Sequence, residues 1–101
     1  MTWLVQMLLP VVHRRRNGRK TYDAITRELA ERFGGATAYT RAPAAGLWKN
    51  PAARTERDDI IVVEVMVDTV DRKWWGAFRR RLEKRLRQKE IVVRAHEVQR
   101  L

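Results

Sequence analysis

The chain contains no cysteine and no serine among its 101 residues. The absence of cysteine excludes disulfides, thiolate metal sites and cysteine nucleophiles, and the absence of serine excludes a serine-based catalytic triad. Histidine is scarce as well, with only His13 and His96. No set of histidine, aspartate and glutamate residues has the spacing of a metal site, and no glycine-rich phosphate-binding loop is present. We therefore expect neither a metal nor a cofactor.

A long hydrophobic run is also missing. The longest apolar stretch near the N-terminus, residues 3–12, is interrupted by Gln6 and Pro10, and it falls short of the roughly 20 residues that span a bilayer. It does not resemble a secretory signal, because arginines follow it where a cleavage site of small residues would lie. We expect a cytoplasmic protein with no membrane partner.

Acidic residues are few: 12 aspartates and glutamates stand against 22 lysines and arginines, which gives a formal net charge of +10. Hydrophobic residues make up 45% of the chain, which is too high for a disordered polycation and sufficient for one packed core. The length predicts a single domain over residues 1–101.

Hydrophobic periodicity predicts four strands and two helices. In the first helix, Tyr22, Ile25, Leu29 and Phe33 recur on one face, and Thr21 can cap the N-terminus. Pro43, Gly46 and Pro51 lie in the segment that follows the second strand, so we expect a long connection there. The predicted elements are strand 2–12, helix 21–33, strand 36–41, connection 42–57, strand 58–68, helix 70–88 and strand 90–98.

The second predicted helix has an aromatic stripe on one face and basic residues on the other. Asp71 or Thr69 can cap its N-terminus. Trp74 lies at the edge of the stripe, where we expect Arg81 and Arg85 to stack on its ring. The stripe consists of Trp74, Trp75, Phe78, Leu82 and Leu86.

The element order β-α-β-β-α-β is that of the split βαβ, or ferredoxin-like, α+β fold. Right-handed crossovers then give one antiparallel sheet in the order 4-1-3-2, with both helices on one face. In this topology the loop at 13–20, the connection at 42–57 and the C-terminal turn of the second helix all meet at one end.

Strand 58–68 places apolar side chains on both of its faces, although the helices cover only one side of the sheet. A second copy that packs sheet to sheet, as an isologous dimer, would cover the exposed apolar face. The alternative is that segment 42–57 folds back over the sheet.

The positive charge is concentrated in two segments. Residues 14–20 carry +5, residues 72–89 carry +8, and the remainder carries −3. Local charge of this kind is typical of a site for nucleic acid or another polyanion, although a solvated helix face explains part of it. The candidate anion-binding residues are Arg14, Arg15, Arg16, Arg19, Lys20, Arg87 and Lys89. We therefore predict a non-enzymatic binding module.

A competing hypothesis places a ligand pocket beside segment 42–57, as in a small cofactor-free enzyme or ligand sensor. Arg41 would bind an anion, Trp48 would form an apolar wall, and His96 would serve as a base. The favoured alternative is that Trp48 closes the open end of the sheet as a core residue. Recognition of RNA bases by aromatic residues of the central strands is not expected, because strand 58–68 has none.

Three segments carry a resemblance: FGG-x-T from Phe33, G-x-W from Gly46, and the run DDIIVVEVMVD at 58–68. With them, residues 21–101 resemble a family of small uncharacterised bacterial proteins of ferredoxin-like fold, a resemblance that implies no activity. The expected sheet-to-sheet dimer is also similar to the dimeric α+β barrel superfamily of small enzymes and ligand sensors. The catalytic patterns of that superfamily are not present here.

Overall fold

The computed structural model describes residues 1–10, 18–49 and 55–101, with the side chains of residues 18–19, 40–49 and 55–59 excluded. Four strands and two helices occur in the predicted order. They are β1 (Thr2–Pro10), α1 (Gly18–Phe33), β2 (Thr37–Lys49), β3 (Thr55–Val67), α2 (Arg72–Arg85) and β4 (Val92–Val98). The prediction of a small α+β protein is thus confirmed.

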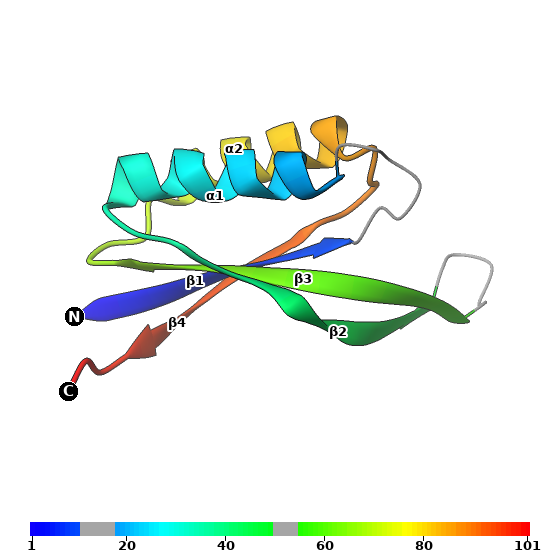
Figure 1. Cartoon of the computed structure of the whole chain (residues 1–101). Helices are drawn as coiled ribbons and strands as arrows, with labels where there is room; N and C mark the ends of the chain where they lie inside the picture. Colours follow the sequence, from blue (N-terminus) through cyan, green and yellow to red (C-terminus); the bar gives the residue numbers. More distant parts are fainter. Residues whose placement is uncertain (11–17, 50–54) are drawn as a thin grey trace.

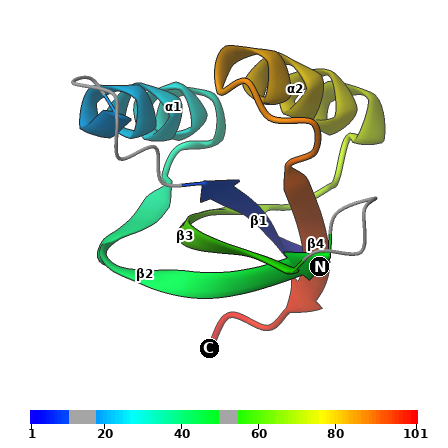
Figure 2. The same cartoon turned by 90° about the vertical axis from the view of Figure 1, so that its right-hand side faces the viewer.

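All strand pairs are antiparallel and form one sheet in the order β2-β3-β1-β4. Counted from the β4 edge, this order is 4-1-3-2. Both helices lie side by side against one face of the sheet (Figure 1, Figure 2). No element of the described part of the chain covers the opposite face, which we call the open face.

The β2–β3 hairpin is longer than the sequence indicates, and the prediction of a connection over residues 42–57 is wrong. Both strands have 13 residues, and their pairing continues to Lys49 and Thr55. The register shifts between Tyr39 and Ala44. Pro43 falls within this irregularity on an edge strand, where a missing N–H donor is tolerated. The hairpin extends beyond the end of β1 (Figure 1), and its far end curls below β1 toward the β4 side of the sheet (Figure 2).

The core lies between the helices and the helix-facing side of the sheet. The predicted stripes of both helices supply it, with Ile25, Leu29, Phe78 and Leu82 all at most 2% exposed. Alternate residues of the two central strands face them. These strand residues are Val5, Met7, Leu9, Ile61, Val63, Val65 and Val67.

An aromatic cluster joins the two helices. The Phe33 ring stacks on Trp75 with centroids 5.1 Å apart, and the Trp74 ring stacks on Phe78 at 5.0 Å. The guanidinium of Arg32 lies 4.4 Å from the Trp74 ring centre. The prediction that Arg81 or Arg85 stacks on Trp74 is therefore wrong, because the guanidinium over the Trp74 ring belongs to Arg32, in the last turn of α1.

The helix ends differ in how well the sequence indicates them. Asp71 caps α2 as predicted, because its carboxylate accepts a hydrogen bond from the Trp74 backbone N–H at 3.1 Å. The first helix begins at Gly18, three residues before the expected cap Thr21. Thr21 therefore lies inside α1, and Lys20 belongs to the first turn of the helix.

Candidate functional site

The first turn of α1 and the end of α2 lie at the same end of the molecule (Figure 1), and basic residues occupy both segments. Lys20 is in the first turn of α1, while Arg87 and Lys89 directly follow α2, and all three side chains are exposed. Arg14, Arg15 and Arg16 fall outside the described residues, and for Arg19 only the backbone position in α1 is described. We define the basic surface as Lys20, Lys84, Arg85, Arg87 and Lys89.

Carboxylates neutralise little of this surface. Within the described part of the chain, the one ion pair joins Arg81 to Glu28 at 3.5 Å, with both side chains largely in solvent. The only acidic residue of α2, Glu83, instead accepts a hydrogen bond from the Ile91 backbone N–H at 2.9 Å. The cations of the basic surface thus remain available to an external anion.

Arg87 occupies a backbone position that suits glycine. Its φ is 53°, in the left-handed region. The turn after α2 is a Schellman motif, in which Arg87 N–H donates to Lys84 O at 3.3 Å and Gln88 N–H donates to Glu83 O at 2.8 Å. A non-glycine residue in this conformation costs about 1 kcal/mol or more. The backbone conformation therefore gives no reason for arginine at this position.

The substitution Arg87→Gly is expected to raise the free energy of unfolding by about 1 kcal/mol, because it removes the strain of the left-handed conformation. Urea unfolding measures the change. Lys89→Gly, two residues further on, removes the same charge outside the left-handed position and should give no gain. A loss of stability in Arg87→Gly would show that the arginine side chain supports the fold.

The predicted pocket of Arg41, Trp48 and His96 is not assembled in the described structure. Arg41 and Trp48 belong to β2, whereas His96 belongs to β4, and these strands are the two opposite edges of the sheet. Three strand spacings separate the edges by roughly 14 Å. His96 is exposed on the open face, with its Cα paired to that of Leu4.

A row of hydrogen-bonded polar side chains, which was not predicted from the sequence, crosses the open face. Arg94 Nε donates to Gln6 Oε1 at 3.0 Å, Gln6 Nε2 donates to Glu64 Oε1 at 2.7 Å, and Tyr39 Oη donates to Glu64 Oε2 at 3.1 Å. The hydrogen bond to Glu64 and the charge of its carboxylate raise the pKa of Tyr39 above 10.0. The row links all four strands.

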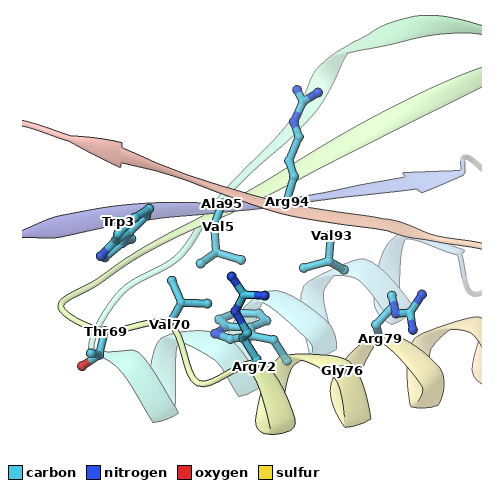
Figure 3. A pocket seen from close by; sticks show the side chains of 11 residues that line it. Trp3, Val5, Thr69, Val70, Arg72, Gly76, Arg79, Val93, Arg94 and Ala95 are labelled. Carbon is cyan, nitrogen blue, oxygen red and sulfur yellow. The ribbon is translucent and has the colours of Figure 1, made fainter.

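A cavity of about 620 Å³ opens between α2 and the edge of the sheet formed by β1 and β4 (Figure 3). Its wall is mostly apolar, with two arginines from α2, Arg72 and Arg79. Among the predicted site residues whose side chains are described, none lines this cavity. The lining consists of Trp3, Val5, Thr69, Val70, Arg72, Trp75, Gly76, Arg79, Val93, Arg94 and Ala95.

Neither a metal-binding cluster nor a membrane-spanning helix occurs among the described residues. No three histidine, aspartate or glutamate residues come close enough there to hold a metal ion. None of the described helices has the length and apolar character needed to cross a membrane.

No family model and no curated protein matches the chain. A phage SAM lyase, solved in complex with S-methyl-5'-thioadenosine, is similar in structure, with a TM-score of 0.64. The similarity covers 95% of this chain and 81% of the lyase, at 11% sequence identity. At this identity the likeness extends to the fold alone, and it supports the ferredoxin-like arrangement.

Proposed function

We propose that the protein is a cytoplasmic, non-enzymatic binding module that holds a phosphate-bearing partner, a nucleic acid first of all, on its basic surface. The observation that carries the proposal is the accumulation of exposed cations without carboxylate partners where α1 begins and α2 ends. Arginine and lysine side chains bind phosphate oxygens through charge-assisted hydrogen bonds. Such contacts release counterions from a nucleic-acid backbone, so affinity depends on salt.

The left-handed conformation of Arg87 supports this reading. Arginine at a glycine position is unfavourable for the fold, and phosphate binding by its guanidinium gives a reason for it. Lys84 and Arg85 in the last turn of α2 are less informative, because cations there also complement the helix dipole. Arg87, in the turn after α2, therefore supports phosphate binding more strongly than the cations within the helix do.

We expect the protein to contact the phosphate backbone of the nucleic acid rather than to stack on its bases. Among the described side chains of the sheet, Tyr39 is the one aromatic residue on the open face. Trp3 instead lines the cavity on the helix side of the sheet. A sheet that stacks successive bases needs several exposed aromatic residues.

Fluorescence anisotropy with labelled single-stranded DNA, duplex DNA, single-stranded RNA and heparin at 50 mM salt tests the proposal. We expect saturable binding to at least one of the nucleic acids. Binding to heparin alone would restrict the partner to other polyanions. Absence of binding to all four would exclude the proposed function.

We further propose that two copies pack through their open faces, in a homodimer. Apolar residues flank the polar row on both sides, and Met66 and Tyr39 are 53% and 49% exposed. Arg94 and Glu64 lie on the strands either side of β1. A twofold axis along β1 would therefore place Arg94 of one copy opposite the partner's Glu64. The flanking apolar residues are Leu4, Leu8, Val62 and Val92.

Sedimentation measures this association. The protein should sediment as a dimer at micromolar concentration, and Met66→Glu should sediment as a monomer because it places a charge in the apolar interface. Ala77→Glu adds the same charge on the exposed side of α2 and should remain dimeric. A monomeric native protein at micromolar concentration would contradict the dimer.

The competing hypothesis is a small enzyme or ligand sensor. Its predicted pocket does not form, because Arg41 and Trp48 lie on β2 and His96 lies on β4, at the opposite edge of the sheet. The similar SAM lyase acts on a small molecule, but at 11% identity its activity does not transfer to this chain. Nothing observed among the described residues favours catalysis.

A further inference from the structure

The cavity between α2 and β4 exists because α2 leaves the edge of the sheet uncovered. Val5, Val93 and Ala95 lie on the helix-facing side of β1 and β4, yet Ala95 is exposed. Figure 3 shows Val5 and Val93 pointing toward α2 across the space. With Trp75, which is 5% exposed, they form an apolar wall of the kind that lines ligand sites.

Two arginines give the cavity its charge. Arg72 and Arg79 are seven residues apart on α2, which separates them by about 10.5 Å along the helix axis on the same side. Figure 3 shows Arg72 directed into the space, whereas Arg94 points away from it. The lining residues that the structure describes include no aspartate or glutamate. An occupant of complementary charge is therefore an anion.

Gly76 lies on α2 between these arginines and lines the same wall. Glycine inside a helix costs roughly 0.5–1 kcal/mol relative to alanine, so its presence calls for a reason. The neighbouring residues do not supply one, since a Cβ at Gly76 would meet only Arg80 Nη1, at an ordinary 3.5 Å. The missing side chain does, however, leave room in the cavity.

We propose that this cavity binds a small organic anion with a flat apolar body. The body lies against Trp75 and Val93, close to the backbone of Gly76, and its acidic group pairs with Arg72 or Arg79. The cavity volume of about 620 Å³ falls within the usual range for small-molecule sites. The cavity shares no residue with the basic surface, so ligand binding in the cavity can be tested independently of polyanion binding.

A matched pair of fluorescent dyes tests the proposal. 8-Anilinonaphthalene-1-sulfonate has a flat apolar body and an anionic group, and N-phenyl-1-naphthylamine has the same skeleton without the charge. We expect the sulfonate to bind one site per chain. Arg72→Gln and Arg79→Gln should each weaken it about tenfold or more, as expected for a lost charge-assisted hydrogen bond, and change the affinity of the neutral dye less than twofold.

Three further variants separate the cavity from general charge and from folding. Arg85→Gln removes one charge from α2 outside the cavity and should change the affinity of the sulfonate less than twofold. Gly76→Leu should block both dyes by filling the space. Gly76→Ala should bind the sulfonate more weakly while melting at a higher temperature, which distinguishes occlusion from misfolding.

Indole N–H resonances report the location. The signals of Trp3 and Trp75, which line the cavity, should shift with the sulfonate, and that of Trp74 should shift less. The proposal is overturned if the sulfonate does not saturate, if Arg85→Gln weakens it as much as Arg72→Gln, or if the arginine variants weaken both dyes equally.

Discussion

Replacing both Arg87 and Lys89 with glutamine is expected to weaken polyanion binding by roughly thirtyfold to a hundredfold at 0.1 M salt, given the counterions that each phosphate contact releases. Both residues are exposed in the turn after α2, without a carboxylate partner among the described residues. Anisotropy titration with the nucleic acid that binds most tightly measures the change. The double variant should also have a smaller salt dependence.

The matched control removes two positive charges elsewhere. Arg27 is exposed on α1, and Arg100 is exposed near the C-terminus, at the end opposite to the basic surface (Figure 1). The variant Arg27→Gln with Arg100→Gln has the same net charge and should lose less than threefold in affinity. Equal losses in the two double variants would mean that net charge, and not the basic surface, governs binding.

The substitution Leu82→Ala is expected to lower the free energy of unfolding by about 2–5 kcal/mol, the usual effect of truncating a buried leucine. Leu82 is 2% exposed and belongs to the hydrophobic core. Its burial fixes the rotation of α2 and thereby directs Arg80 and Lys84 outward. Urea unfolding at neutral pH measures the loss.

A chemically identical substitution at an exposed site is the control. Leu101 is fully exposed at the C-terminus, so Leu101→Ala should change stability by less than about 0.5 kcal/mol. If Leu82→Ala fails to fold, Leu82→Met should fold with a loss below about 1.5 kcal/mol, since its volume is conserved. A Leu82→Ala loss as small as that of Leu101→Ala would contradict the packing of α2.

The helices and the core could be predicted because each depends on a local pattern. The stripe from Tyr22 to Leu29 and the stripe from Trp75 to Leu82 follow the helical period and are buried, and Phe33 packs partly buried against them. The β2–β3 hairpin could not be predicted in the same way. Pro43 and Gly46 suggested a connection, and only pairing with β3 allows an edge strand to continue past them.

The candidate sites also differ in whether the sequence could predict them. Sequence alone placed Arg87 and Lys89 at one end with the start of α1, because the topology determines where helix ends lie. The polar row from Tyr39 to Arg94 needed the register of four strands, which alternation along one strand does not provide. The cavity needed the position of α2 over the sheet, although a glycine inside the helix, Gly76, was a sequence signal for it.

The salt dependence of nucleic-acid affinity is the most direct test of the proposed function. We expect the logarithm of the association constant to fall linearly with the logarithm of salt concentration. A slope steeper than about −2 is expected, which corresponds to about three or more phosphate contacts on the basic surface. Anisotropy titrations from 50 to 200 mM salt give this slope. A slope near zero, or no binding at 50 mM, would contradict the account.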